Sequence, residues 1–414
     1  MLKRLVAIGF IFVCTAVAWM VLGSTIFART YVSDSSLKAK VEQIWGAPQA
    51  QRAPSARYTV TRVFTEESTV NGAKVTKAVK HYETRTAPLM GSDVQVQLGL
   101  EHRQKGLLWY AAYRTGFQAS YQFRNDAAEA KTLTVTFPFP AQHAIYDDFR
   151  FAVRGGTWLA KPVARDGQVE GQVQARAGEV VTVDVGYRSQ GLDRWTYLLG
   201  REDAKGATEV RNFRLVMDTD FAEIDFPEDA MAPSAKERTA TGWRLAWQYS
   251  DLIAGVNIGM LLPQRLQPGP LAGEISFFAP VSLFFFFVVI LAIAVVRRIE
   301  LHPMHFFFLA AAFFAFHLLL AYLVDHVSIH AAFVVASLVS VGLVVSYLRM
   351  VVGTRFAFVE AALAQLVYLV AFSYAFFFKG FTGLAVTVGA ILTLFVLMQM
   401  TARIRWSEVF EKKS

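Results

Sequence analysis

Apolar residues along this chain are concentrated in six long runs, and the segments between those runs are far more polar. A helix needs about 20 apolar residues to cross the hydrocarbon core of a bilayer, and each run is long enough to do so. The pattern therefore predicts six membrane-spanning helices, at residues 5–27, 276–296, 304–324, 329–348, 356–378 and 381–400.

The long segment between the first two runs has a different pattern. Apolar and polar residues alternate in stretches such as "YTVTRVFTE" at 58–66 and "KTLTVTFPF" at 131–139, and turn-forming clusters such as "VNGAK" separate those stretches. Short alternating stretches between turns indicate half-buried strands. The predicted fold class is a membrane α-helical bundle of six spans, with a large β-rich, sandwich-like domain between spans 1 and 2.

The two patterns divide the chain into four parts. They are an N-terminal transmembrane anchor at 1–27, a β-rich domain at 28–272, a five-helix transmembrane bundle at 273–402 and a tail at 403–414. The first run follows two basic residues, as a signal peptide does, but its length and the poor cleavage sequence "IFART" favour an uncleaved anchor. The pattern of "DSSLKAKVEQIW" at 34–45 predicts a separate short helix, with Asp34 or Ser35 as its N-cap.

The basic residues near the membrane predict the orientation of the chain. If the six spans alternate in direction, ten Lys and Arg residues lie on one side, and the short loops of the other side contain only Lys379. The positive-inside rule assigns the basic side to the cytoplasm. Both termini are then cytoplasmic and residues 28–272 are periplasmic, in a bacterial inner membrane. Of the net charge of +8, +6 lies outside residues 28–275, so we expect no nucleic-acid partner.

Composition excludes several kinds of site from the β-rich domain. The single cysteine, Cys14, lies in the first span, so the domain has neither disulfides nor Cys-based metal sites. The adjacent Asp147 and Asp148 would point to opposite faces of a strand, which argues against a shared acid–base role. The domain sequence also lacks the common nucleophile, zinc and phosphate-binding motifs. We therefore predict that the protein is not an enzyme and has no catalytic residue, no metal and no cofactor.

The candidate functional residues lie in the stretch 297–330, which holds five of the eight histidines of the chain. At 1.5 Å per residue along a helix, His305 and His326 lie about 30 Å apart, so the histidines cannot form a single site. The candidates are Glu300, His302 and His305 at the cytoplasmic end of the span, His317 near mid-membrane, and Asp325 and His326 at the outer end.

A structural role is the favoured interpretation for each of these groups. A buried polar side chain in a bilayer needs a partner inside the bundle. We expect His317 to form a hydrogen bond with Ser337 or Ser340, which the next, antiparallel helix places at a similar depth. Asp325 and His326 would lie in a hydrated turn.

Two functional alternatives stay open. A transporter or channel would place His317 and Asp325 on its pathway, although the bundle sequence lacks the Gly and Pro interruptions and the internal repeat that often mark such sites. A metal-dependent membrane enzyme would bind its metal through Glu300, His302 and His305 at the cytoplasmic face.

Five motifs mark a resemblance to a known family. They are "WGAPQ" at 45–49, "GWRLAWQYS" at 242–250, "LHPMHFFF" at 301–308, "DH" at 325–326 and "TARIRW" at 401–406. On these motifs the chain resembles the CreD family of bacterial inner-membrane proteins, which is linked to cell-envelope integrity and colicin tolerance. His305 and Phe306 stand where members of the family have Gln-Tyr, so the chain resembles a divergent member.

The resemblance implies an architecture and a location rather than a chemistry. We predict a non-enzymatic inner-membrane protein that supports cell-envelope integrity or a stress response. Its periplasmic domain would bind or sense an envelope component, so the expected partners are the lipid bilayer and an envelope protein or the cell wall.

Overall fold

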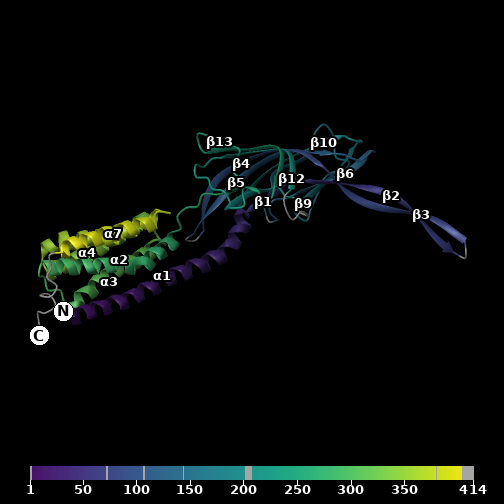
Figure 1. The fold of residues 1–414 in the computed structure, drawn as a ribbon. Coiled ribbons are helices and arrows are strands. Elements are labelled where there is room, and N and C mark those ends of the chain that lie inside the picture. Colours follow the sequence, from purple (N-terminus) through teal and green to yellow (C-terminus); the bar gives the residue numbers. More distant parts are fainter. Residues whose placement is uncertain are drawn as a thin grey trace. The chain divides into compact units, whose positions relative to one another are not determined.

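Helices and strands occupy separate parts of the chain, as the hydrophobic pattern predicts (Figure 1). The computed structural model describes residues 2–70, 73–105, 108–142, 144–200, 208–378 and 380–402. The tail at 403–414 and His143 lie outside these residues. The chain forms two units, one made chiefly of residues up to Ser36 and from Leu266 onward, the other of Leu37–Lys105 and Trp109–Arg265.

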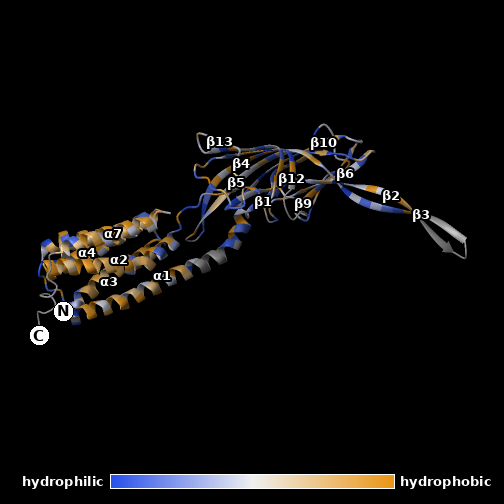
Figure 2. Cartoon of the chain, in the orientation of Figure 1, coloured by the Kyte–Doolittle hydropathy of each residue, from blue (hydrophilic) through white to orange (hydrophobic). Residues whose placement is uncertain are grey.

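Six helices in the described part of the chain are long and apolar enough to cross a membrane. Figure 2 shows the predominance of apolar residues along α2, α3, α4 and α7. The spans belong to α1 (Leu2–Trp45), α2 (Pro268–Val296), α3 (Pro303–Leu323), α4 (Ile329–Val351), a fifth span (Phe356–Phe377) and α7 (Thr382–Thr401). The predicted helical part of the fold class is confirmed.

Helix α1 continues well beyond the first apolar run. The prediction of a separate helix at 34–45 is wrong, because α1 runs without a break from Leu2 to Trp45. Residues 28–45 contain neither Gly nor Pro, the residues that most strongly end a helix. The helix ends at Trp45, and the next residue, Gly46, has a φ of +95°, in the region that glycine adopts without strain.

The fifth span is not a uniform α-helix. It consists of two π-helical segments, η1 (Phe356–Ala361) and η2 (Leu366–Ala371), with α5 (Ala362–Gln365) between them, followed by α6 (Phe372–Tyr374) and the 3-10 helix η3 (Ala375–Phe377). The sequence of the span contains neither Gly nor Pro, so the usual helix-breaking residues do not account for the irregularity. π-helical turns are rare and often occur at functional sites.

The described residues of the other unit contain fifteen strands in three sheets. The seven-stranded sheet has the order β13 (Ala235–Arg238), β14 (Trp243–Ala254), β12 (Thr208–Thr219), β4 (Leu89–Lys105), β5 (Leu108–Arg124), β10 (Val180–Leu192) and β7 (Asp147–Val153). The five-stranded sheet has the order β3 (Ala73–Ala87), β2 (Ser55–Val70), β6 (Lys131–Pro138), β9 (Gln168–Ala175) and β8 (Val163–Arg165). The third sheet consists of β1 (Gln49–Arg52), β11 (Arg194–Leu198) and β15 (Ile258–Leu261).

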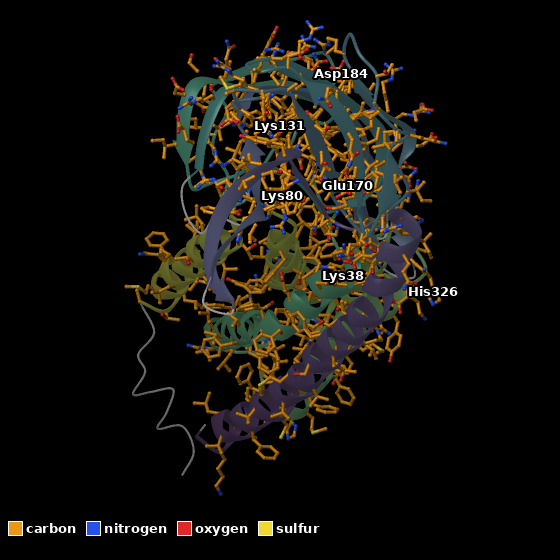
Figure 3. The ribbon with its side chains drawn as sticks, turned by 90° about the vertical axis from the view of Figure 1, so that its right-hand side faces the viewer. Lys38, Lys80, Lys131, Glu170, Asp184 and His326 are labelled. Carbon is orange, nitrogen blue, oxygen red and sulfur yellow. The ribbon has the colours of Figure 1, made fainter. Side chains whose placement is uncertain are left out.

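The three sheets share one hydrophobic core, in agreement with the β-rich, sandwich-like prediction. Alternate residues of β5, such as Phe117 and Tyr121, are buried together with Val135 and Phe137 of β6. The intervening residues of β5 lie on the other face of the sheet, because successive side chains of a strand point to opposite sides. That outward face is polar, and Figure 3 shows Asp184 of β10 among its side chains.

Candidate functional site

The outward face of the seven-stranded sheet carries a row of polar residues from strands far apart in sequence. Arg188 of β10 lies opposite Gly116 of β5. Asp218 of β12 lies opposite Gln97 of β4 on one side and Arg244 of β14 on the other. A Cβ atom built on Gly116 would lie 3.5 Å from Gln97 Oε1, so the row is continuous across the middle of the sheet.

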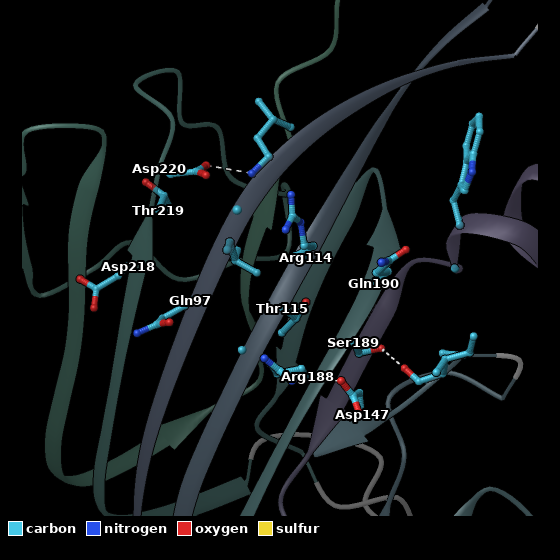
Figure 4. A pocket seen from close by; sticks show the side chains of 18 of the residues that line it. Gln97, Arg114, Thr115, Asp147, Arg188, Ser189, Gln190, Asp218, Thr219 and Asp220 are labelled. Carbon is cyan, nitrogen blue, oxygen red and sulfur yellow. Dashed lines mark hydrogen bonds and ion pairs between the residues drawn. The ribbon is translucent and has the colours of Figure 1, made fainter. Parts of the chain in front are cut away.

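Glycine residues in this row and in the next one leave a hollow on the sheet. In the next row across the sheet, Gln190 lies opposite Arg114. The same row includes Gly99, where a Cβ atom would lie 3.3 Å from Asp220 Oδ2. Because Gly116 and Gly99 have no side chains, a groove of about 830 Å³ opens over this part of the sheet (Figure 4). Its volume is within the range of small-molecule sites, about 300–1000 Å³.

Two segments outside these strands form the walls of this hollow, which we call the sheet groove. One wall is the end of α1 with the glycine that follows it, residues 43–46. The other wall is the approach to β7, with Ala144, Ile145 and Asp147. Ile145 is 83% exposed and Ile44 is 58% exposed, so both walls present apolar surface at the rim.

The arginine at one end of the groove is held by two carboxylates. Arg188 Nη2 lies 3.1 Å from Asp147 Oδ2 and 2.5 Å from Asp148 Oδ2. The prediction that these two aspartates point to opposite sides of a strand is wrong. Asp148 has a left-handed backbone with φ of 49°, and the pairing of β7 with β10 shifts register between Gly186 and Arg188.

The other charged groups of the groove also have fixed partners. Arg114 Nε lies 3.1 Å from Glu101 Oε2. Asp218 Oδ1 lies 2.8 Å from Arg244 Nε. Asp220 Oδ1 accepts a hydrogen bond of 2.8 Å from a backbone N–H of β4. Since each partner uses only part of the hydrogen-bonding capacity of these groups, the remaining donors and acceptors are held in place for a ligand.

Strand β1 supports the groove from beneath. Gln49 is 1% exposed; its Nε2 donates to Ser189 Oγ at 2.9 Å and to the Gln190 carbonyl at 3.0 Å, and its Oε1 accepts from Thr115 Oγ1 at 3.0 Å. A Cβ atom on Gly46 would overlap the Gln190 carbonyl oxygen. The "WGAPQ" motif therefore joins the end of α1 to the strand below the groove floor, a role that the sequence alone does not reveal.

The cytoplasmic group of candidate residues does not converge on one point. Glu300 lies 3.9 Å from Arg4 and is mostly exposed. His302 is the N-cap of α3 and accepts a hydrogen bond from a backbone N–H of the first turn. His305 Nδ1 lies 2.6 Å from Tyr347 Oη. Within the described residues, no three His, Cys, Asp or Glu side chains are close enough to bind a metal together.

The mid-membrane histidine faces α1 rather than α4. His317 is fully buried, and its Nδ1 lies 2.9 Å from the Phe313 carbonyl. The expected hydrogen bond with Ser337 or Ser340 is wrong, because both hydroxyls donate to backbone carbonyls instead. The imidazole packs at 88° to the indole of Trp19, with ring centroids 5.6 Å apart. His317 Nε2 and Trp19 Nε1 have no hydrogen-bond partner among the described residues.

The outer group also contacts α1. Asp325 Oδ2 lies 3.1 Å from Arg29 Nη2. His326 lies in the turn after α3, where its backbone N–H donates to the Leu323 carbonyl at 2.9 Å. Glu300, His317 and Asp325 thus each meet a residue of α1, and the three contacts are spread along the length of α3. The geometry indicates that these candidates dock the first span onto the bundle.

A polar layer inside the bundle was not predicted. Gln365 is fully buried at the end of α5, between the two π-helical segments. Its Nε2 donates to Ser340 Oγ at 2.8 Å, and that hydroxyl donates to the Ala312 carbonyl at 2.6 Å. Gln365 Oε1 has no partner among the described residues. The one sequence signal was Gln365 itself, a strongly polar residue in the middle of the fifth apolar run.

Comparison with known proteins identifies a family whose members the membrane bundle resembles. Residues 277–407 match the model of a family described as "Inner membrane protein CreD", so the resemblance seen in the sequence motifs is confirmed over these residues. No curated protein matches the chain significantly. A solved structure of a candidate nutrient binding protein from Legionella pneumophila is 10% identical, with a TM-score of 0.31, over 59% of this chain and 79% of that chain.

Proposed function

We propose that the chain, whose residues 277–407 match the CreD inner-membrane family, supports cell-envelope integrity by binding an envelope component in the sheet groove. The β-rich domain faces the periplasm, and both termini are cytoplasmic. The bundle anchors this domain, and no chemical reaction is part of the role. The observation that carries the proposal is the groove itself, a hollow of about 830 Å³ lined by charged groups that fixed partners hold in place.

The orientation follows from the distribution of basic residues and can be tested first. In a Cys14→Ser background, Thr157→Cys places a thiol at an exposed site of the β-rich domain, and Thr354→Cys places one in the exposed turn after α4. We expect a membrane-impermeant maleimide to label Thr157→Cys in intact spheroplasts and Thr354→Cys only after permeabilisation. Labelling of Thr354→Cys in intact spheroplasts would reverse the proposed orientation.

The role of the groove can be tested with two matched glycine variants. A Cβ atom on Gly116 meets only Gln97, at ordinary contact distances, so Gly116→Val should fold while filling the groove floor. Gly186 lies on the same face of β10 outside the groove, and a Cβ atom there meets its nearest atom at 3.6 Å. In a host that lacks the chromosomal copy, we expect Gly186→Val to restore resistance to envelope stress and Gly116→Val to fail at equal membrane abundance. Equal rescue by both variants would contradict a functional groove.

The geometry of the bundle favours this role over transport or metal chemistry. A transport pathway would need His317 and Asp325 to face a route through the bundle, whereas both side chains face α1. A metal enzyme would need Glu300, His302 and His305 to share a ligand, whereas each has a different partner. These contacts support docking of α1 as the role of the polar residues around α3.

A further inference from the structure

We infer that the sheet groove binds a neutral polysaccharide chain of the envelope, a conclusion that rests on the proposed binding function and specifies its ligand. The lining combines three kinds of groups: charged side chains with free hydrogen-bonding capacity, amide side chains, and exposed apolar side chains at the rim. A sugar ring needs all three, because hydroxyl groups surround its edge while its two faces consist of C–H groups.

The balance of charge disfavours a polyanion. The groove is lined by two arginines, Arg114 and Arg188, and by three aspartates, Asp147, Asp218 and Asp220. Each guanidinium already contacts a carboxylate, at 3.1 Å or less. A phosphate-rich or carboxylate-rich chain would therefore meet more negative than positive groups. A neutral ligand can use the same arginines as N–H donors and the same aspartates as acceptors.

The amide groups extend this hydrogen-bonding surface along the groove. Gln97 lies in the middle of the floor beside Gly116, and Gln190 lies next to Arg114 in the neighbouring row. A carboxamide offers donors and an acceptor in one plane, as hydroxyl pairs on a sugar require. Because Gly99 and Gly116 have no side chains, the floor of the groove stays open between these groups.

The apolar surface lies where the faces of sugar rings would pack. Ile44 and Trp45 are on one wall and Ile145 is on the other. These isoleucines are 58% and 83% exposed, and contact with a ligand would remove their apolar surface from water. Lipid tails would need a mostly apolar channel, which the charged floor does not provide.

The topology disfavours a peptide bound by strand addition. Strand addition needs a free sheet edge, where unpaired backbone groups can join the ladder. The groove lies over β10, β5, β4 and β12, each of which has a neighbouring strand on both sides. A ligand here must be recognised by side chains alone.

The test uses the full-length protein in phosphatidylcholine nanodiscs, because maltoside detergents would compete with a glycan. The probes are chitotetraose and maltoheptaose as neutral glycans, polyphosphate as a polyanion and tetra-alanine as a peptide, each titrated by calorimetry. We expect saturable binding of at least one glycan, weakened at least tenfold in Gly116→Val and unchanged within twofold in Gly186→Val. The affinity should change less than twofold between low and high salt, because a neutral ligand forms no ion pairs that salt could screen.

Three outcomes would overturn the inference: no glycan binding, glycan binding that Gly116→Val leaves unchanged, or binding of polyphosphate or the peptide that Gly116→Val abolishes. The last outcome would leave the proposed groove function intact with a different ligand. By contrast, equal complementation by Gly116→Val and Gly186→Val would remove the proposed function itself.

Discussion

Replacing Gly46 with alanine tests the junction between α1 and the sheet. Gly46 has a φ of +95°, in a region that is strained for residues with a side chain. An added Cβ atom would also overlap the Gln190 carbonyl oxygen, which accepts a hydrogen bond from Gln49. The backbone of this segment must therefore move away from β10 to admit the methyl group. That movement breaks hydrogen bonds of Gln49 beneath the groove.

The expected loss of stability has two parts. A left-handed conformation costs a non-glycine residue about 1–2 kcal/mol. Gln49 Nε2 also bonds Ser189 Oγ at 2.9 Å, and each buried polar group left without a partner costs about 1–3 kcal/mol. We expect Gly46→Ala to lower the free energy of unfolding of the β-rich unit by about 2–5 kcal/mol, from these two terms together.

Two control glycines separate the two terms. Gly178 has a φ of +73° but nothing within 4 Å of its Cβ position, so Gly178→Ala should show only the conformational cost. Gly255 has neither a positive φ nor a neighbour within 4 Å, and Gly255→Ala should change stability by less than about 0.5 kcal/mol. Urea unfolding of the full-length protein can be followed by fluorescence, because six of its eight tryptophans lie in residues 37–265. If Gly46→Ala costs no more than Gly178→Ala, the packing argument is refuted.

Three further predictions concern the bundle and the sheet core. Gln365→Leu removes a buried oxygen that has no partner among the described residues, and Ser340 keeps its bond to a backbone carbonyl. The free energy of unfolding in denaturing detergent should therefore change by less than about 1 kcal/mol, whereas a loss above about 3 kcal/mol would show that Oε1 has a partner. Burial raises the pKa of Tyr146 from 10.0 to about 12, so its contribution to stability is complete below pH 10 and is lost as pH rises through 12. The tyrosinate absorbance that the wild type shows and Tyr146→Phe lacks should appear together with unfolding, and its appearance near pH 10 in a still-folded domain would contradict this. Asp325→Arg should weaken the docking of α1, and the double variant with Arg29→Asp should restore it. A double-mutant cycle should give a coupling energy of about 0.2–1 kcal/mol between the two residues. Strictly additive effects of the two substitutions would argue against the ion pair.

Periodicity was enough to predict the six apolar helices and the β-rich domain, because long apolar runs and period-two alternation are properties of neighbouring residues. The continuation of α1 through 34–45 was missed because polar residues after the membrane run were interpreted as a new helix. The π-helical segments were missed because no Gly or Pro marks them. Each of these errors concerns how a helix continues, which depends on packing as well as on local sequence.

The groove could not be predicted, because it depends on strand register. Gly116, Gln97, Arg188 and Asp218 come from four strands, and only the pairing of those strands brings them into one row. The contact of His317 with Trp19 could not be predicted either, because it depends on how two helices far apart in the sequence pack together. A motif such as "WGAPQ" can mark a position as distinctive without revealing which strand lies against it.

The two π-helical segments make the orientation of the end of the fifth span sensitive to insertions and deletions. An α-helix turns about 100° per residue, so one extra residue accommodated in a π segment rotates everything after it by about that angle. The direction in which the aromatic residues of Phe372–Phe377 point therefore depends on the two π-helical segments that precede them. A single deletion within Leu366–Ala371 would keep the span apolar and long enough for the membrane, yet turn this aromatic end toward a different helix. Along this span, insertions and deletions should be more damaging than most substitutions.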